Sequence, residues 1–508
     1  MRLLQRMSEF KEQPAVVSKD GQSFTYAQVL SRTNALAHEI KTKTGKSDLR
    51  GERVAFLCDP GIDYVVAKLS IFQLGGCAVP LCTFHPESEL QYIIDDAEPF
   101  LLLSDTKYTS AAGILASKSR GLYQMSVGEY LSESFSDAAF STSVSQDGAL
   151  VVYTSGTTGK PKGVVTRYSA LDCQITDQIE SWGWTKEDRV LNCLPLHHVH
   201  GIVNLTLVPL YSGACVEFTT ADKIWQRLMI GPLGGGQVTV FMAVPTVYSK
   251  LIREFDALQD ILKTRASKAA SELRLMVCGS AALPTTVMHR WKEITGHVLL
   301  ERYGMTEFCM GLSNPLSPVS SRLAGYVGNP MPSVSVKIID QETGKLASDG
   351  EPGMLFVSGK TVFNEYWKNP KATRKEFDAD GWFNTGDVAA YDPIEKSYRI
   401  LGRASADIIK TGGYKVSALE IERILLEYEG IDEIAVVGVP DEYYGERVAA
   451  VIKWNGLNAF SESAFKEWAF LKLAKYKVPT VVKIVPDIPK NAMGKVAKKV
   501  LSKQLFPC

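Results

Sequence analysis

Short apolar runs alternate with helical patterns along most of the chain. Five of these runs end in turn-forming or small residues and are predicted to be buried strands: residues 53–58, 100–105, 149–155, 238–245 and 273–280. After the last run, residues 284–296 have the pattern of an amphipathic helix, with Val287, Trp291 and Ile294 on one face. This alternation predicts an α/β fold with a mostly parallel sheet, in which ligands bind where the strands end.

The pattern changes near residue 400. Residues 397–403 predict a strand, and the small, polar sequence "ASAD" follows it. Ser417 and Glu420 then form a capping box at the start of a helix that Gly430 is predicted to end, and two further strand-like runs follow. We therefore expect a large α/β domain and a small α+β domain joined by a hinge, at residues 1–403, 408–508 and 404–407, respectively.

Composition narrows the possible functions. The 508 residues exceed what one hydrophobic core normally serves, and 45% of them are hydrophobic and 22% charged, as in ordinary globular proteins. Basic and acidic residues balance at 56 each, so no overall field attracts nucleic acid. No apolar run approaches the ~20 residues of a transmembrane segment. Nine scattered cysteines without a C-x-x-C pair favour reduced thiols in an intracellular compartment over a disulfide framework or a zinc ribbon.

The sequence "YTSGTTGKPKG" at residues 153–163 combines the groups that bind phosphate. Two glycines allow backbone N–H groups to form an anion nest, and hydroxyl groups and lysines surround them: Gly156, Gly159, Ser155, Thr157, Thr158, Lys160 and Lys162. The loop is not a Walker loop, because Pro161 follows Lys160 where Ser or Thr is required, and the dinucleotide pattern G-x-G-x-x-G is absent. A plain surface turn is the alternative interpretation.

Four further motifs follow this loop in order: "ERYGMTE" at 301–307, "GWFNTGD" at 381–387, "ILGRASADIIKTGGYKV" at 400–416 and "PKNAMGK" at 489–495. Together the five motifs resemble those of the adenylate-forming superfamily, which includes acyl-CoA synthetases, luciferases and peptide-synthetase adenylation domains. The resemblance covers nearly the whole chain. It implies a large domain of layered α/β subdomains with a small mobile C-terminal domain. It also implies that ATP, Mg²⁺ and CoA take part in a reaction that joins an acid to a thiol.

The resemblance assigns nucleotide-binding residues to all five motifs and to the turn at 278–283. ATP would be held by Thr154, Ser155, Gly156, Thr157, Thr158, Gly159, Lys160, Pro161, Lys162, Ser280, Tyr303, Asp387 and Arg403. Asp387 would accept both ribose hydroxyls, since its two oxygens suit two neighbouring donors. Thr306 would contact the α-phosphate, Glu307 would hold Mg²⁺, and Lys495 would stabilise the adenylation transition state. Taken singly, each could instead be a turn former, a surface acid or a solvated lysine.

The small domain of the superfamily rotates between its two half-reactions. The resemblance implies that Gly412, Gly413 and Tyr414 line the CoA tunnel after this rotation. The pivot would be Ser405, where relatives usually carry Asp or Lys, and "ASAD" is one residue longer than the common form.

Three of the seven histidines fall in "HHVH" at residues 197–200. A metal site is one interpretation, but no cysteine or acidic cluster is expected to supply further ligands. A core or gating role is predicted for His197. By resemblance, His198 would act catalytically near the acyl pocket and the thiol entrance, and His200 would face the substrate.

Arg302 indicates which acid is used. An arginine in the acyl pocket would oppose the burial of an alkyl chain, but it can hold a second carboxylate with two hydrogen bonds. The alternative is that Arg302 pairs with Glu301 or another acid. The sequences "ERYGMTE", "HHVHG", "RLAGYVGNPMP" (322–332) and "ADIIKTGGYKVSALE" resemble those of malonyl-CoA synthetases, in particular the animal mitochondrial type. The resemblance implies a malonate–CoA ligase that could also use methylmalonate.

Three other functions fit parts of the sequence: a medium- or long-chain fatty acyl-CoA synthetase, a non-catalytic acyl-binding or scaffold protein, and a carrier-protein adenylation domain. The resemblance implies the mitochondrial matrix. The first fourteen residues carry two early arginines and no acid before Glu9, but they are short for a transit peptide, so the cytoplasm is the alternative.

Overall fold

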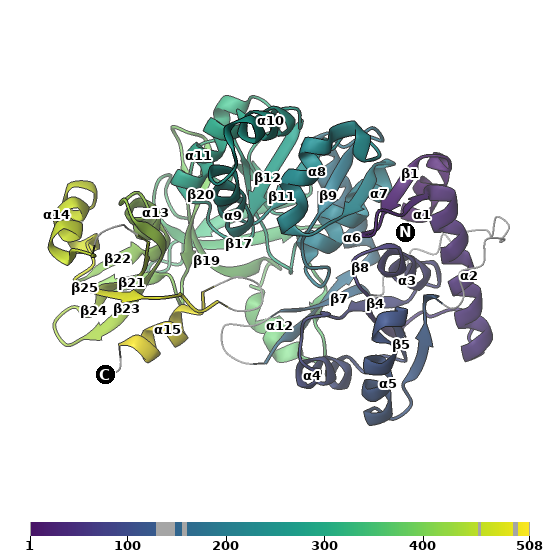
Figure 1. Cartoon of the computed structure of the whole chain (residues 1–508). Coiled ribbons are helices and arrows are strands. Elements are labelled where there is room, and N and C mark those ends of the chain that lie inside the picture. The colour runs from purple at the N-terminus through teal and green to yellow at the C-terminus, as the bar shows by residue number, and fades with distance from the viewer. Residues whose placement is uncertain (1, 129–147, 155–159, 456–458, 491–495, 507–508) are drawn as a thin grey trace.

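The computed structural model describes residues 2–128, 148–154, 160–455, 459–490 and 496–506. Two large sheets with helices between them build the N-terminal part, and a small α+β domain follows, so the predicted fold class is confirmed (Figure 1). The N-terminus lies in the large part and the C-terminus at the edge of the small domain.

The first large sheet has nine strands, parallel at its centre and antiparallel at both edges. In spatial order they are β15 (Asn329–Pro330), β14 (Leu312–Ser313), β13 (Leu300–Tyr303), β12 (Leu275–Gly279), β11 (Val240–Ala243), β9 (Arg189–Asn192), β10 (Cys215–Phe218), β1 (Pro14–Val17) and β2 (Ser23–Thr25). The central strands carry continuous apolar runs because both faces of the sheet are covered by helices.

The second large sheet has seven strands, which are parallel at its centre and at one edge and antiparallel at the other edge. In spatial order they are β18 (Glu365–Tyr366), β8 (Lys162–Arg167), β7 (Gly148–Thr154), β4 (Cys77–Pro80), β3 (Arg53–Leu57), β5 (Leu101–Ser104) and β6 (Tyr123–Ser126). The motif that is predicted to bind phosphate joins β7 to β8, which are antiparallel and pair Thr154 with Lys162. The two ends of the motif are therefore fixed side by side.

Strand alternation sorts the apolar side chains into separate layers. Val190 and Val240 face a core shared with the seven-stranded sheet, whereas Leu191 and Phe241 face an outer layer of helices. The shared core contains α2 (Tyr26–Thr44), α3 (Ile62–Gln73), α6 (Tyr168–Trp182), the π-helix η4 (His200–Leu207) and α7 (Val208–Ser212). The outer layers are α8 (Ile224–Ile230), α9 (Pro245–Asp256), α10 (Asp260–Ser271) and α11 (Thr285–Thr295) on one sheet, and α4 (Glu87–Ala97) and α5 (Thr109–Lys118) on the other.

A four-stranded antiparallel sheet completes the large part. Its strands are β16 (Val334–Ile339), β17 (Gly353–Gly359), β19 (Phe383–Asp392) and β20 (Ser397–Arg403), and the short α12 (Pro370–Glu376) precedes β19. The antiparallel register places Asp387 on β19 opposite Arg403 on β20.

The described residues of the small domain form a five-stranded sheet, three α-helices and a short 3-10 helix. Its elements are β21 (Ile408–Thr411), β22 (Tyr414–Ser417), α13 (Ala418–Leu425), β23 (Ile431–Asp441), β24 (Gly445–Trp454), α14 (Glu462–Lys472), β25 (Val481–Val485) and α15 (Lys498–Leu505). Ion pairs join it to the large part: Arg253 of α9 contacts Asp432 at 2.8 Å, and Lys415 contacts Glu342 at 2.8 Å. The domain limits given by the sequence stay predictions.

The helix predicted near the start of the small domain forms, but it is shorter than predicted. Ser417 caps α13 by accepting a hydrogen bond from the Glu420 N–H, but the Glu420 carboxylate contacts Lys477 at 2.6 Å, so only this half of the predicted capping box forms. The helix ends at Leu425, five residues before Gly430, because the N–H groups of Glu427 and Tyr428 bond three residues back and tighten the chain into turns. Within the described residues, no helix is long and apolar enough to cross a membrane.

Candidate active site

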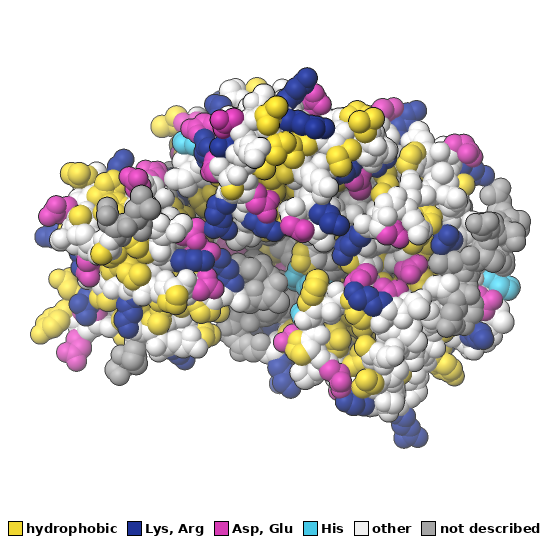
Figure 2. Space-filling view, in the orientation of Figure 1, with side chains coloured by type: hydrophobic (Ala, Val, Ile, Leu, Met, Phe, Trp, Pro, Cys, Tyr) yellow, Lys and Arg dark blue, Asp and Glu magenta, His cyan; other side chains and the backbone are white. Residues whose placement is uncertain are grey.

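Several of the predicted site residues follow the ends of two neighbouring strands. Tyr303 ends β13 and Ser280 follows the parallel strand β12, so both lie at the same edge of the nine-stranded sheet. Thr306 and Glu307 continue from β13. Figure 2 shows a hollow between the two halves of the molecule with histidine side chains in it.

Asp387 is a buried carboxylate held by two donors. Arg403 Nε lies 3.0 Å from Asp387 Oδ1, and the Tyr303 hydroxyl donates a 2.6 Å hydrogen bond to Oδ2. Burial is the largest influence and opposes the charged form of Arg403, but the neighbouring groups Asp387, Tyr303, Glu307 and Asp407 together outweigh it and raise the Arg403 pKa. Burial and Asp387 also raise the Tyr303 pKa well above its usual value, so its hydroxyl stays protonated and donates. The carboxylate is thus oriented before any ligand binds.

Glu307 is a second buried carboxylate, and Tyr366 of β18 holds it. The Tyr366 hydroxyl donates to Glu307 Oε1 at 2.8 Å, and Lys162 Nζ lies 4.7 Å from the centre of the Tyr366 ring. Burial raises the Glu307 pKa, while the Tyr366 hydrogen bond and the charges of Arg403 and Lys162 oppose this rise. These interactions bring the end of the phosphate motif to the same region as the pair of Asp387 and Arg403.

The described parts of the phosphate motif are held by α4. The Tyr92 hydroxyl donates to the Pro161 carbonyl at 2.8 Å, and Lys160 Nζ lies 5.3 Å from the Tyr92 ring centre. Residues 155–159, which include Ser155, Gly156, Thr157, Thr158 and Gly159, lie outside the described residues, and so does Lys495. Sequence reasoning missed Tyr92 and Tyr366, because no local pattern marks a tyrosine that contacts a motif far along the chain.

Arg302 is a buried cation, with only 3% of its surface exposed. Its Nη2 donates to Ser280 Oγ at 3.3 Å, and its Nε has no hydrogen-bond partner in the described part of the chain. Burial lowers the Arg302 pKa to about 10, so the side chain is still cationic at neutral pH. Among the described residues, no carboxylate lies within 4.0 Å of its guanidinium group.

Glu301 does not neutralise Arg302. Neighbouring residues on a strand point to opposite faces, and Glu301 Oε1 accepts a 3.1 Å hydrogen bond from the Leu283 N–H instead. Burial raises the Glu301 pKa to about 7. The alternative that Arg302 pairs with Glu301 is therefore wrong.

His200 lies beside Arg302 and is also buried. Its Nδ1 is 3.5 Å from Ser280 Oγ, so Ser280 contacts both side chains. Burial, followed by the charge of Arg302, lowers the His200 pKa well below its usual value. His200 is therefore neutral, which leaves Arg302 as the positive charge of this cluster. Ser280 has a φ of 70°, a strained value for a residue with a side chain.

Cys309 lies near Arg302 and contacts two further polar residues. Cys309 Sγ is 3.5 Å from Asn204 Oδ1 and 3.6 Å from Gln178 Nε2. Burial raises the Cys309 pKa to about 12, although the charge of Arg302 opposes the rise. The Asn204 Nδ2 and Gln178 Oε1 atoms are buried without partners in the described structure. Sequence reasoning missed this group, because Gln178 and Cys309 are far apart in the chain and belong to no common motif.

The histidines before His200 form a separate cluster. The rings of His197 and His198 have centroids 4.0 Å apart, and the His197 ring meets His85 edge-on at 5.3 Å. Burial lowers the His197 pKa to about 2. The expectation that no cysteine lies nearby is wrong, because a tight turn before α4 brings Cys82 and His85 to His197.

The predicted hinge is a compact turn. The Asp407 N–H bonds to the Arg403 carbonyl at 2.7 Å, and the Arg403 N–H bonds to Asp407 Oδ2 at 2.9 Å, so Ser405 lies inside a closed loop. Lys498 of α15 contacts both Asp407 and Glu422, at 2.6 and 2.7 Å. The hinge role of Ser405 stays a prediction.

The predicted CoA segment joins β21 to β22. Gly412 and Gly413 have φ values of 54° and 85°, which favour glycine. Tyr414 is 54% exposed and stacks on Tyr476 with ring centroids 4.2 Å apart. An exposed aromatic pair is thus available on the small domain.

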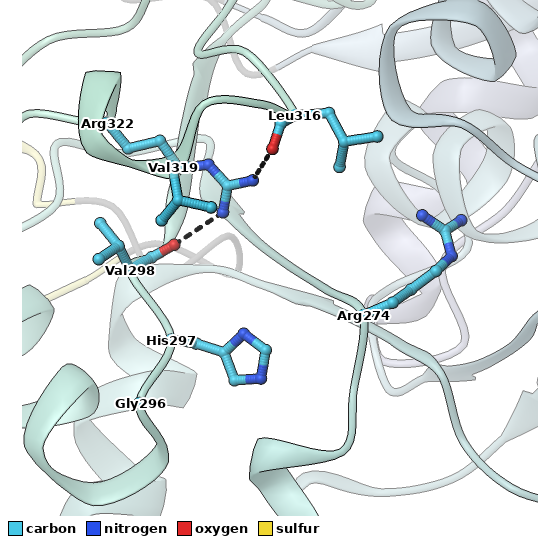
Figure 3. Close-up of a pocket in the computed structure, with 7 residues that line it drawn as sticks. All are labelled: Arg274, Gly296, His297, Val298, Leu316, Val319 and Arg322. Carbon is cyan, nitrogen blue, oxygen red and sulfur yellow. Dashed lines mark hydrogen bonds between the residues drawn. The ribbon is translucent and has the colours of Figure 1, made fainter.

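A pocket of about 380 Å³ lies elsewhere (Figure 3). Its lining residues are Arg274, Gly296, His297, Val298, Leu316, Val319 and Arg322. Arg274 and Val298 precede β12 and β13, whereas Ser280 and Tyr303 lie at the other ends of these strands. Arg322 donates to the carbonyls of Val298 and Leu316, so its charge is used in holding loops together. This pocket is therefore separate from the candidate active site.

Comparison with known proteins identifies the family. Residues 3–367 match the family described as AMP-binding enzyme, and residues 420–495 match the AMP-binding enzyme C-terminal domain. The chain belongs to the AMP-binding enzyme family. Membership accounts for the two-part architecture and for the order of the five motifs.

Relatives of this AMP-binding enzyme include CoA ligases. It is 43% identical to malonate–CoA ligase ACSF3, mitochondrial, of Mus musculus, over 99% of this chain and 90% of the relative. Its structure matches ATP-bound MatB from Rhodopseudomonas palustris with a TM-score of 0.87 at 31% identity, covering 100% of this chain and 99% of MatB. It also matches a malonyl-CoA ligase ternary product complex with methylmalonyl-CoA and AMP bound, with a TM-score of 0.65 at 34% identity, covering 94% and 97% of the two chains.

Proposed function

We propose that this AMP-binding enzyme is a malonate–CoA ligase. In the proposed reaction, one carboxylate of malonate attacks the α-phosphorus of ATP and releases pyrophosphate. The CoA thiol then displaces AMP from the malonyl-adenylate. The observation that carries the choice of malonate is Arg302, a buried guanidinium with no carboxylate within ion-pair distance in the described structure.

A second carboxylate on the substrate would form an ion pair with the buried guanidinium group of Arg302. Leaving a charged group buried without a partner costs several kcal/mol, so a folded chain that keeps such a group has a use for its charge. A planar guanidinium can hold a carboxylate through two parallel hydrogen bonds. Arg302 Nε is buried and available for one of them. The neutral His200 beside it can accept or donate a further hydrogen bond to the same carboxylate.

The rival substrates fit this pocket less well. A medium- or long-chain fatty acid would place alkyl groups against the Arg302 guanidinium and leave its charge unmatched. Methylmalonate keeps both carboxylates and adds one methyl group, so we retain it as a second substrate. A non-catalytic scaffold has no need for the oriented carboxylates of Asp387 and Glu307.

We propose that the nucleotide binds on the side of the site that contains Asp387, away from Arg302. Asp387 would accept hydrogen bonds from the ribose hydroxyls with its two carboxylate oxygens, which Tyr303 and Arg403 orient. Thr306 would contact the α-phosphate. Lys160, Lys162 and Thr154 would approach the β- and γ-phosphates together with residues 155–159, because the pairing of β7 with β8 holds the two ends of this loop together. The first step joins two anions, so positioning and charge neutralisation supply most of its catalysis.

The residues around Glu307 fit a magnesium ion. Glu307 is a buried carboxylate with Oε1 oriented by Tyr366, and Mg²⁺ in nucleotide sites is held by one or two carboxylates together with substrate phosphates. When bound there, Mg²⁺ would neutralise charge on the phosphates during adenylation. Lys162 lies on the same side and adds a positive charge of the protein itself.

CoA is proposed to enter after the small domain rotates. The structure resembles ATP-bound MatB more than the product complex, although the product complex has the more similar sequence. A rotation of the small domain between the two steps would account for this difference. In the arrangement before rotation Lys495 would serve adenylation, and after it Gly412, Gly413 and Tyr414 would line the CoA path near His198. The name of the Mus musculus relative refers to mitochondria, and we carry the mitochondrial matrix forward as the predicted compartment.

A substrate panel tests the proposed function. ATP-dependent pyrophosphate release and thioester formation are measured with malonate, methylmalonate, acetate and octanoate, each with and without CoA. Malonate should give the highest kcat/KM, and methylmalonate should follow. Acetate and octanoate should be used at least about 100-fold less efficiently, because neither has a second carboxylate to form the buried ion pair with Arg302. Equal or better use of octanoate would refute the malonate assignment while leaving the acyl-CoA synthetase activity intact.

A further inference from the structure

A cysteine and two histidines from distant parts of the chain converge beside the candidate active site. Cys82 and His85 lie between β4 and α4, in a turn closed by a 3.2 Å hydrogen bond from the His85 N–H to the Cys82 carbonyl. His197 lies between β9 and η4. One ligand atom from each of the three side chains lies within 4.8 Å of the others.

We propose that Cys82, His85 and His197 form a binding site for one zinc ion. One thiolate and two imidazole nitrogens are ligands that Zn²⁺ prefers, whereas Mg²⁺ prefers oxygen. Neighbouring ligand atoms in a tetrahedral zinc site are roughly 3.5 Å apart, given Zn–N and Zn–S bonds of about 2.0 and 2.3 Å. Side-chain rotations that close the cluster by about 1 Å would therefore complete the site, and water could take the fourth position.

Two features of the cluster favour metal binding. Glu89 Oε2 lies 3.4 Å from His85 Nδ1, which makes no hydrogen bond in the described structure, and a small rotation would let this carboxylate accept one and fix the orientation of His85 for metal binding. His197 Nε2 is a buried nitrogen with no hydrogen-bond partner in the described structure. A buried polar atom without a partner costs about 1–3 kcal/mol, and a metal bond would remove this cost.

The proposed ion would connect two segments that shape the active site. His197 directly precedes His198 and lies three residues before His200, whose side chain borders Arg302. Zinc bound at His197 would tie this loop to the turn before α4, the helix whose Tyr92 holds the phosphate motif at Pro161. The inference does not depend on the identity of the acid, so the zinc site can exist even if malonate is not the substrate.

Metal titration of the full chain tests the site. Protein dialysed against a chelator is titrated with Zn²⁺ by calorimetry and with Co²⁺ by absorption spectroscopy, in which a thiolate ligand gives a charge-transfer band. One equivalent of each ion should bind. Cys82→Ser should abolish the charge-transfer band, and His197→Ala should weaken Zn²⁺ binding at least about 100-fold. Glu89→Gln, which leaves all three ligands in place, should weaken it about 10-fold.

Matched variants separate this site from general binding to thiols and histidines. Cys173→Ser changes a half-buried cysteine and His289→Ala an exposed histidine outside the cluster, and both should bind Zn²⁺ as the unchanged chain does. Amide hydrogen exchange of the segment around His197 should slow when zinc is added to the unchanged chain but not to Cys82→Ser. The proposal is overturned if no stoichiometric binding occurs, or if binding persists equally in Cys82→Ser and His197→Ala.

Discussion

The two sides of the candidate active site differ in whether a buried charge has a partner of opposite charge among the described residues. On the nucleotide side, the negative charge of Asp387 meets the positive charge of Arg403 and a hydrogen bond from Tyr303. On the acyl side, Arg302 is as deeply buried, but its described neighbours are neutral: Ser280, His200 and Cys309. Arg302 lies on β13 of the nine-stranded sheet, whereas Asp387 and Arg403 face each other across β19 and β20 of the four-stranded sheet.

This difference indicates that the acyl side needs a negative charge from its ligand, whereas the nucleotide side does not need a charge. The Asp387 charge already has a partner within the protein, so the proposed nucleotide would add hydrogen bonds to a group that is already oriented. In the described part of the chain Arg302 has no carboxylate partner, and its burial is a cost to folding that a bound carboxylate would offset. Substitutions of the two arginines should therefore have different effects on stability and on substrate choice.

The largest effect is expected from Arg302→Met, which removes the charge and keeps a side chain of similar length. The kcat/KM for malonate should fall at least about 100-fold, since a desolvated ion pair is lost. The denaturant midpoint of the ligand-free protein should stay the same or rise, because an unmatched buried charge is removed. Steady-state pyrophosphate release and urea unfolding measure the two results.

Arg322→Met is the matched control for Arg302→Met. Arg322 is also buried and lies at the opposite end of the strands, where it donates to three backbone carbonyls. Its substitution should lower stability, since the carbonyls lose their donors, and leave the preference for malonate over acetate unchanged. A similar loss of malonate preference in both variants would mean that Arg302 acts through folding alone.

The next effect is expected from Arg403→Met on the nucleotide side. This change leaves the Asp387 carboxylate buried with only its remaining hydrogen bonds, so the free energy of unfolding should fall by about 3 kcal/mol. The KM for ATP should rise, whereas discrimination between malonate and acetate should persist. Unfolding measured by urea and substrate kinetics checks both parts. An unchanged unfolding free energy would contradict the interpretation of the Asp387 pair as preformed.

A smaller effect is expected from Tyr303→Phe. The substitution removes one hydrogen bond to a charged carboxylate, worth about 1.5 kcal/mol or more, so the KM for ATP should rise about 10-fold. Malonate kinetics at saturating ATP should change little. Tyr398→Phe, in a tyrosine that packs against Tyr391 on the four-stranded sheet, is the control and should leave the KM for ATP unchanged.

The smallest effect concerns acid stability and His200. Its pKa in the folded protein lies well below the ordinary value of 6.5, so only the unfolded state takes up its proton as the pH falls. This contribution to stability is present above pH 6.5 and is lost below it, by at most about 1.4 kcal/mol per pH unit. His200→Gln should therefore flatten the stability profile between pH 6.5 and 5.5.

The exposed His289 supplies the control for this profile. Unfolding of both variants is followed by circular dichroism at each pH, and His289→Gln should retain the acid sensitivity of the unchanged chain. The explanation is wrong if His200→Gln loses stability with acid as steeply as the unchanged chain does.

Much of the fold was predictable because its signals are local. The strands β3, β5, β7, β11 and β12 and the cap at Ser417 follow from apolar runs and from capping residues close in sequence. The end of α13 was misplaced, since turns rather than helix carry the chain from Leu425 to Gly430. That choice depends on packing against β23 and β24, which no local pattern contains.

The site was predictable only where motifs carry it. Asp387, Arg403 and Arg302 lie in motifs, whereas Tyr366, Tyr92 and Cys82 reach the site through the folding of distant segments. The neutral surroundings of Arg302 could not be predicted either, because the sequence places Glu301 directly beside it. Strand alternation turns that carboxylate to the other face.

The most direct test of the Arg302 assignment compares malonate with malonamate, in which an uncharged amide replaces one carboxylate at nearly the same size. ATP–pyrophosphate exchange with each acid gives the ratio of the two kcat/KM values for the unchanged chain and for Arg302→Met. We predict that the unchanged chain prefers malonate by at least about 100-fold and that Arg302→Met reduces this preference to within about 10-fold. A preference for malonate that survives intact in Arg302→Met would contradict the account.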